Sequence, residues 1–276
     1  MPADAEPAPP VVAGSSASFA VTEGDDATGV LILCDHATNI VPAPYGDLGL
    51  PPGELERHIG YDIGALAVTQ ALAARLGAPA VTSRFSRLLI DPNRGEDDPT
   101  LIMRLSDGAV VPGNRTVDAA ERERRLNRFY RPYHAAIAAR LAAMRQKGIV
   151  PLIISMHSYT PVWRGVARRW HAGILWDRDP RAAVPMIAGL RADPALVVGD
   201  NEPYDGALHG DTLYRHATSA GLPHVLVEVR QDLIAGGPGA EAWATRLAPI
   251  VTAIRGLPEV GEIARFGSRS DRPHRA

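Results

Sequence analysis

Apolar residues in this chain gather in short uninterrupted runs, and stretches with a helical repeat separate one run from the next. The runs at 29–35 (GVLILCD) and 149–156 (IVPLIISM) contain very few polar positions. A strand that is apolar on both faces is typical of a parallel sheet covered by helices on each side. Shorter runs predict further strands at 79–83, 88–90, 173–176, 196–198 and 224–229.

Between the runs, apolar residues recur every three or four positions, which predicts helices. The longest repeat covers 118–147, where Asp118 and Glu121 resemble a capping box and Pro132 should kink or restart the helix. Residues 91–117 show little periodicity and are expected to form a long loop. Shorter repeats predict helices at 62–76, 182–192, 212–220 and 240–255. This alternation predicts a three-layer α/β/α fold around a mostly parallel, mixed sheet.

The alternation runs through most of the chain without an internal repeat or a clear linker. We therefore expect a single domain over residues 27–260, with disordered tails at 1–26 and 261–276. The first tail is rich in Pro, Ala and Ser, and it lacks the basic start and apolar core of a signal peptide. The second is polar and basic, as frayed termini often are.

Composition narrows the class of protein. Hydrophobic residues make up 46% of the 276 residues and charged residues 22%, which is enough apolar material for a sizeable core. A formal net charge of −2 argues against nucleic acid as a partner. No apolar run approaches the roughly 18 residues that span a bilayer. A single cysteine, Cys34, excludes an internal disulfide framework, and we expect a cytoplasmic protein. The sequence does not indicate an oligomeric state.

Two histidines stand where a site would form. In open α/β sheets, sites gather beyond the carboxyl ends of the strands. His36 follows the first buried run and His157 follows the second. Imidazole is a common zinc ligand, and a catalytic zinc needs three protein ligands plus an open position. We therefore predict that His36 and His157 hold zinc. The alternative for each is a histidine that is only hydrogen-bonded at a strand end.

The third ligand stays open between two residues. Asn39 lies three residues after His36, but an amide is a poor zinc ligand. Asp62 is the better candidate chemically, although it could equally be the N-cap of its predicted helix.

Other polar residues near strand ends suggest catalytic and binding roles. Glu228 lies in the apolar run HVLVEV, where burial would raise its pKa toward that of a general base, unless it faces solvent. Arg87 and Arg94 suit a carboxylate or an oxyanion, although an Asp91–Arg94 ion pair would also account for Arg94. Tyr133 could face a cleft, but at its helical position a core role is commoner.

Seven motifs in order resemble the N-formylglutamate amidohydrolase family, over residues 31–234. They are CDHATN, HIGYDIGA, SRLLIDPNRG, FYRPYH, ISMHSY, GDNEPYDG and HVLVEVRQDLI. The resemblance implies a zinc-dependent exopeptidase-like fold with one zinc per chain. Family members carry PHSG or PHAG at the first histidine, where this chain has DHATN, so it resembles a divergent branch.

The resemblance also implies roles for single residues. His36 and His157 are metal ligands, and Asp62 falls on the family's acid, while Asn39 stands where carboxypeptidase-like proteins have a glutamate. Glu228 falls on the catalytic glutamate. The remaining positions imply contacts to a substrate carboxylate or oxyanion, or a place in the cleft: Arg87, Asn93, Arg94, Tyr133 and Asn201.

The expected reaction is metal-assisted hydrolysis of a small N-acyl amino acid, N-formylglutamate, to formate and glutamate at the end of histidine degradation. Glu228 would take the proton of water, Arg87 would stabilise the oxyanion and Arg94 would hold a substrate carboxylate. Two alternatives remain. One is a zinc deacylase or carboxypeptidase-like peptidase acting on another N-acyl amino acid or small peptide. The other is a non-catalytic binding relative, which Asn39 would favour. No GxSxG motif supports a serine hydrolase.

Overall fold

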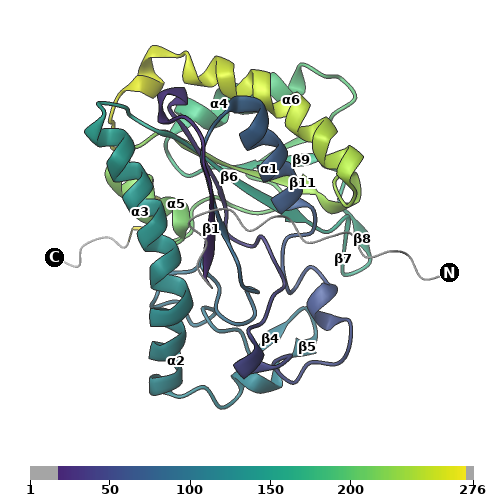
Figure 1. Ribbon diagram of the computed structural model, residues 1–276. Helices are drawn as coiled ribbons and strands as arrows, with labels where there is room; N and C mark the ends of the chain where they lie inside the picture. The colour runs from purple at the N-terminus through teal and green to yellow at the C-terminus, as the bar shows by residue number, and fades with distance from the viewer. Residues whose placement is uncertain (1–17, 272–276) are drawn as a thin grey trace.

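A computed structural model describes residues 18–271 (Figure 1). Seven strands form one sheet in the order β1-β3-β2-β6-β11-β9-β10. Neighbouring strands run parallel except at β1–β3 and β11–β9. The mixed, mostly parallel sheet that the sequence predicts is confirmed. Its strands are β1 (Phe19–Thr22), β2 (Val30–Cys34), β3 (Ala80–Ser83), β6 (Leu152–Tyr159), β9 (Ala172–Leu175), β10 (Val198–Asp200) and β11 (His224–Arg230).

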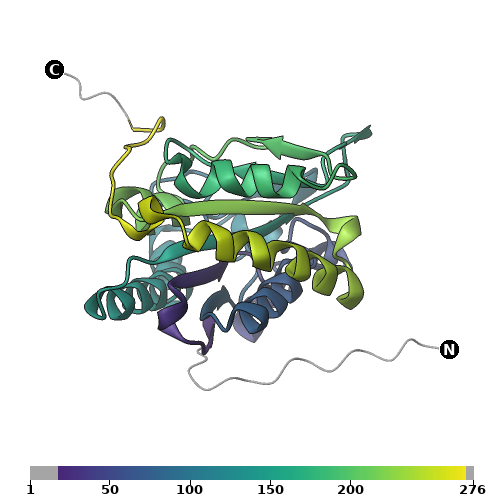
Figure 2. The same ribbon diagram turned by 90° about the horizontal axis from the view of Figure 1, so that it is seen from above.

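Helices cover both faces of the sheet. The main helices are α1 (Ala65–Leu76), α2 (Ala119–Arg125), α3 (Arg131–Gln146), α4 (Pro180–Arg191), α5 (Thr212–His216) and α6 (Gly237–Arg255). On one face, α6 lies between α1 and α4 (Figure 2). Helix α3 covers the other face (Figure 1). Two small hairpins extend from the body: β4 (Leu105–Ser106) with β5 (Ala109–Val110), and β7 (Val162–Trp163) with β8 (Val166–Ala167).

Alternation along the strands divides the core into two layers. In β2, Ile32 packs toward α1 and α6, whereas Leu31 and Leu33 pack toward α3. All five residues of this strand are buried, which is why the sequence run is apolar without interruption. Within residues 18–271, no helix is long and apolar enough to cross a membrane.

The long predicted helix forms, and its expected break takes a specific shape. Helices α2 and α3 join through a π-helical segment, Leu126–Tyr130, which ends two residues before Pro132. A proline cannot donate its backbone nitrogen and its ring crowds the preceding turn. The widened turn accommodates both effects, so the helix continues instead of restarting.

Several predicted boundaries were wrong. Residues 88–90 form a buried turn, not a strand, because a short apolar run cannot be told from other buried structure by pattern alone. The predicted helix at 62–76 begins only at Ala65, after Gly64 in a left-handed conformation. The expected loop at 91–117 contains the β4–β5 hairpin. Short 3-10 turns occupy Asp26–Thr28, Ala43–Tyr45, Glu54–Glu56, Pro112–Asn114, Thr218–Ala220, Gln231–Leu233 and Pro258–Gly261.

Both predicted tails include residues that the structure shows to be ordered by contacts. Strand β1 lies within the predicted first tail and pairs with β3. Near the other end, Arg269 pairs with Asp177 and Asp205. Backbone pairing holds the first segment and partly exposed ion pairs hold the second, and a polar composition alone does not reveal such contacts. Residues 1–17 and 272–276 lie outside the described residues, and the count of one domain stays a prediction.

Candidate metal centre and its cavity

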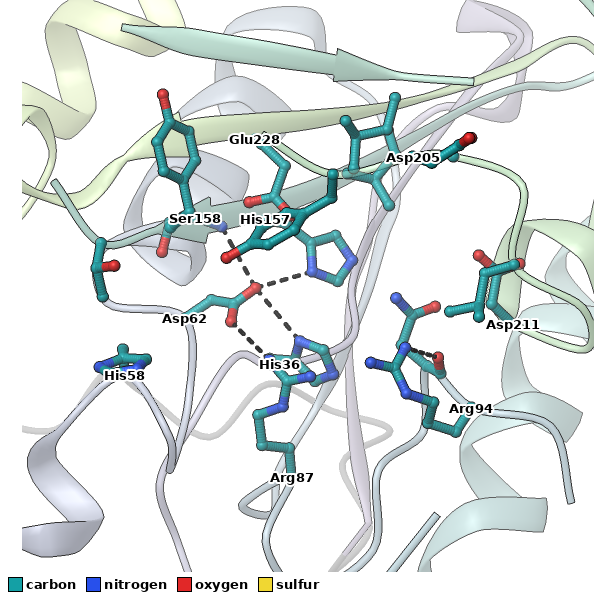
Figure 3. A pocket seen from close by; sticks show the side chains of 18 of the residues that line it. His36, His58, Asp62, Arg87, Arg94, His157, Ser158, Asp205, Asp211 and Glu228 are labelled. Carbon is teal, nitrogen blue, oxygen red and sulfur yellow. Dashed lines mark hydrogen bonds and ion pairs between the residues drawn. The ribbon is translucent and has the colours of Figure 1, made fainter. Parts of the chain in front are cut away.

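Three buried side chains meet at the carboxyl edge of the sheet. His36 follows β2 and His157 lies near the end of β6, and these strands run parallel and adjacent. Asp62 comes from the loop before α1, where its backbone nitrogen donates to the carbonyl oxygen of His36 at 2.9 Å. The Nδ1 atoms of His36 and His157 lie 3.3 and 2.8 Å from Oδ2 of Asp62 (Figure 3). One ligand atom from each residue falls within 4.8 Å of the other two.

The outer nitrogen of each histidine is held by a second carboxylate. Nε2 of His36 lies 2.7 Å from Oδ1 of Asp91, and Nε2 of His157 lies 3.1 Å from Oδ2 of Asp35. A carboxylate on the outer nitrogen favours a proton on Nε2, which would leave the lone pair of Nδ1 for a metal ion. Carboxylate–histidine pairs of this kind are the usual support of metal-binding histidines.

Charge in this cluster also suits a cation. Burial raises the pKa of Asp35, but its hydrogen bond to His157 and the nearby charge outweigh burial and lower that pKa to about 2. Burial likewise opposes ionisation of Asp62, yet nearby His36 lowers its pKa below the usual range. In the same way, Arg87 lowers the pKa of the buried Asp91. The same carboxylates raise the pKa of His157 against the effect of its burial. Three buried carboxylates of low pKa around two imidazoles form a donor set that can hold a metal ion.

The structure brings Asp62, and not Asn39, to the two histidines. Asp62 is 4% exposed and accepts a further hydrogen bond from the backbone nitrogen of Ser158. Asn39 is not among the residues that line the cavity at this centre. Of the two third ligands considered from the sequence, only Asp62 is placed to complete the set.

A cavity of about 500 Å³ opens on the triad. Glu228 lines it from β11, where it is the register partner of His157 on the neighbouring parallel strand. Its Oε2 is buried and has no hydrogen-bond partner within residues 18–271. Burial raises the pKa of Glu228 to about 7, and the nearby carboxylate of Asp62 adds to that effect. Glu228 faces the cavity, where a carboxylate of raised pKa can accept or donate a proton near neutral pH.

Two arginines line the same cavity, and they differ in their partners. Arg87 donates to Oδ2 of Asp91 from Nε at 3.1 Å and from Nη2 at 2.8 Å, and it lies 3.4 Å from Oδ1 of Asp62. Arg94 donates to the Thr100 hydroxyl and to the carbonyl oxygen of Asn93. The suggested Asp91–Arg94 ion pair does not form, because Asp91 is already paired with Arg87 and His36.

Asn93 lines the cavity, and its backbone nitrogen and side-chain oxygen position neighbouring segments. Its backbone nitrogen donates to Asp91 at 2.9 Å, and its side-chain oxygen accepts from the backbone nitrogen of Thr212 at 3.1 Å. It therefore joins the loop after Asp91 to the start of α5.

Tyr133 and Asn201, which were expected to contact substrate, are not among the residues that line the cavity. Tyr133 is fully buried, and its hydroxyl donates to Asp35 at 2.8 Å, on the side away from the cavity. Asn201 accepts hydrogen bonds from the backbone nitrogens of Trp176 and Gly206. It shapes the loop that carries Tyr204 to the cavity. Both residues act through the neighbours that they position.

Reasoning from the sequence missed Asp35, Asp91 and Asp211 as members of the site. The first two adjoin His36 and the buried run at 88–90, and this adjacency was the available signal. Asp211 lines the cavity, is 4% exposed, and accepts from the backbone nitrogen of Tyr214 at 2.6 Å. Burial raises its pKa to about 7. In the sequence it has only the pattern of a helix N-cap.

The fold and the site together define an α/β protein with a buried two-histidine, one-carboxylate centre that can hold a metal ion, set at the carboxyl edge of a mostly parallel sheet. The model of the N-formylglutamate amidohydrolase family matches residues 28–235. The chain belongs to this family, which confirms the resemblance carried by the motifs.

Individual relatives agree with this assignment. The chain is 28% identical over 163 residues to an N-formylglutamate deformylase of Pseudomonas aeruginosa, a match covering 53% of this chain and 58% of that relative. Little more than half of the relative's length is thus matched. A solved structure of gene product Atu2144 from Agrobacterium tumefaciens is 36% identical, with a TM-score of 0.80 over 86% of this chain and 94% of the other. An N-formylglutamate amidohydrolase from Ralstonia eutropha JMP134, 23% identical, shares the fold with a TM-score of 0.66 over 87% and 97% of the two chains.

Proposed function

We propose that this chain is a zinc-dependent amidohydrolase that converts N-formylglutamate to formate and glutamate, the last step of a histidine-breakdown route. The proposal rests on the buried His36–Asp62–His157 triad and on Glu228 in the same cavity, whose Oε2 has no hydrogen-bond partner among the described residues. Family membership and the N-formylglutamate deformylases among its relatives support the choice of substrate.

His36, Asp62 and His157 would hold the zinc ion, since two imidazoles and one carboxylate are a usual ligand set for catalytic zinc. When bound there, zinc supplies Lewis-acid chemistry, lowering the pKa of water and polarising a carbonyl group. Asp91 and Asp35 would keep both imidazoles in the tautomer that presents Nδ1 to the ion.

Glu228 is the proposed general base. It takes a proton from the attacking water and delivers that proton to the nitrogen of the leaving amine. Arg87 stabilises the negative charge that develops on the formyl oxygen, from a position fixed by Asp91 and Asp62. Arg94 carries no ion-pair partner within the described part of the chain and is the proposed contact for a substrate carboxylate. The cytoplasm remains the proposed compartment.

A second candidate is hydrolysis of an N-acyl amino acid with a larger acyl group. Part of the cavity wall is apolar, because Leu175, Leu208 and Leu226 contribute to it. A formyl group alone offers these side chains little to contact.

The test combines metal content with a substrate panel. Purified protein should hold close to one zinc ion per chain and release formate from N-formylglutamate, and a chelator should stop the release. Hydrolysis of N-acetylglutamate and N-butyrylglutamate, measured by the release of free amine, tests the second candidate. Absence of bound metal together with turnover that chelators leave unchanged would contradict the proposed mechanism. Tight zinc binding without turnover of any N-acyl substrate would instead indicate a binding relative.

A further inference from the structure

Arg168, just after the β7–β8 hairpin, lies against the cavity wall among aromatic rings. Its guanidinium carbon is 5.4 Å from the ring centre of Tyr159, 5.4 Å from that of Trp163 and 5.0 Å from that of Tyr204. Nη1 lies 3.4 Å from the carbonyl oxygen of Thr160 and 3.3 Å from its hydroxyl. Tyr159, Thr160 and Tyr204 all line the cavity. Stacking on ring faces, with hydrogen bonds to Thr160 and Tyr204, restricts the orientation of the guanidinium. Its five N–H donors are more than these contacts use.

No carboxylate neutralises this arginine among residues 18–271, where no ion pair of Arg168 forms. The nearest acidic residue along the lining loop, Asp205, is paired with Arg269 at 2.6 Å. Glu228 also lines the cavity, and it forms no ion pair with Arg168. A half-buried guanidinium beside a cavity, without an acidic partner, is a site for an anion supplied from outside the chain.

Arg94 is the other arginine at the cavity without an acidic partner in the described segment. The two lie on different walls. Arg94 and Asp211 flank one side of the triad, and Ser158 and His58 lie toward the other side (Figure 3). Tyr159 and Thr160, which contact Arg168, directly follow Ser158 in the chain. A ligand that lies across the triad therefore meets Arg94 at one end and, at the other, the part of the wall against which Arg168 packs.

We propose that Arg168 is a further substrate-binding residue, which selects dicarboxylic N-acyl amino acids by binding the second carboxylate while Arg94 binds the first. This inference rests on the proposed function and deepens it, because it explains how the chain would tell N-formylglutamate from N-formylglutamine. The two substrates have nearly the same shape and differ in one charge. The parallel N–H donors of a guanidinium bind a carboxylate more tightly than they bind an amide.

The kinetic test compares these two substrates in three proteins: wild type, Arg168→Gln and the control Arg164→Gln. Arg164 lies on the same hairpin, is exposed, and stacks over the Trp163 ring at 5.7 Å. We expect Arg168→Gln to raise KM for N-formylglutamate about 10- to 100-fold with kcat nearly unchanged, as for loss of uniform binding. KM for N-formylglutamine should change less than about 2-fold. The control should leave both substrates unchanged.

If Arg168 had a purely structural role, its replacement would change KM for both substrates alike, and that result would overturn the inference. An unchanged KM for N-formylglutamate would overturn it as well. Binding of glutarate and of butyrate, measured by calorimetry, separates this inference from the proposed function. Wild type should prefer glutarate, and Arg168→Gln should lose the preference. If no N-formyl amino acid is hydrolysed, the proposed function fails. The glutarate measurement still decides the role of Arg168, because equal binding of glutarate by both proteins rejects it.

Discussion

At the scale of single residues, the centre depends on pairs of side chains that act together. His36 and His157 turn Nδ1 inward because Asp91 and Asp35 occupy their Nε2 atoms. Asp35 is held in turn by the Tyr133 hydroxyl at 2.8 Å. Each carboxylate lies where water is excluded, so its hydrogen bonds are strong and an unpaired partner would be costly. The same principle makes Glu228 and Asp211, which have few partners, the groups whose pKa values rise.

Replacing Glu228 with Gln tests its role as the general base. We expect kcat to fall by about 10²- to 10⁴-fold, the usual contribution of a positioned base, while zinc stays bound. Metal content and formate release are the two measurements. Glu241→Gln is the matched control, because Glu241 is 59% exposed on α6. A rate near that of wild type in Glu228→Gln would remove this residue from the mechanism.

Asp211 predicts a pH dependence of stability. Its folded-state pKa of about 7 lies above the roughly 3.9 of an unfolded aspartate, so the folded protein holds an extra proton between these values. Stability contributed by this proton is complete below about pH 4 and is lost as pH rises through about 7. We expect Asp211→Asn to become more stable relative to wild type over that range, by up to about 4 kcal/mol.

Urea unfolding of Asp211→Asn and wild type at several pH values measures this difference. Asparagine caps helices about as well as aspartate, so the cap itself is preserved. Asp118→Asn is the control, since Asp118 caps α2 with a similar hydrogen bond but is exposed. A stability difference that does not vary with pH would contradict the raised pKa of Asp211.

At the scale of elements, the loops between strands bring side chains to the cavity from positions that the strands do not reach. The loop at 201–206 crosses β9 closely, because Gly173 and Gly199 have no side chain in its path. A Cβ atom at Gly173 would overlap the carbonyl oxygen of Glu202. This close approach allows Tyr204 to reach the cavity.

Gly173→Ala should therefore displace that loop. We expect a loss of about 1–3 kcal/mol in the free energy of unfolding, as for other overpacked interiors, and a higher KM. Chemical unfolding and steady-state kinetics measure the two effects. Gly237→Ala is the control, since nothing lies within 4 Å of a Cβ atom at that position in α6. Equal stability of both variants would show that the loop yields without strain.

At the scale of the whole molecule, the sheet gathers residues that lie far apart in the sequence. Strands β2, β6 and β11 are adjacent and parallel, so their carboxyl ends share one edge. His36, His157 and Glu228 meet there because each strand contributes one residue at that edge. The centre is thus tied to the most buried part of the fold.

Metal removal should therefore lower thermal stability. A ligand at about 100 times its Kd adds about 2.7 kcal/mol, which for a protein of this size shifts Tm by about 5–10 °C. Scanning calorimetry of chelated protein, with and without added zinc, measures the shift. Asp62→Asn should lose most of it. His171→Gln, outside the cavity lining, should keep it. An unchanged Tm on adding zinc to wild type would argue against a metal bound at this centre.

Local pattern revealed much of the fold and half of the site. The runs that became β2, β6 and β11 were evident because strands buried on both faces must be apolar throughout. The residue at the end of each such strand was then a candidate. The apolar run at 88–90 was misassigned because burial, and not strand pairing, explains its composition.

Contacts between distant segments could not be found in this way. Asp62 and Asp91 reach His36 across 26 and 55 residues, and Asp35 is reached by Tyr133 across 98. No spacing rule links such positions. Tyr133 and Asn201 occur in the right motifs, but their side chains point to structural partners instead of the cavity.

The amino-acid sequence alone determined the layered α/β architecture, the positions of His36 and His157 at strand ends, and membership of the family, because periodicity and ordered motifs are local properties. Tertiary structure alone decided that Asp62 joins the histidines, that Asp35 and Asp91 orient them, and that Arg168 reaches the cavity wall. These outcomes depend on how strands and loops pack in space, and side-chain direction is set by that packing, not by neighbours in the chain.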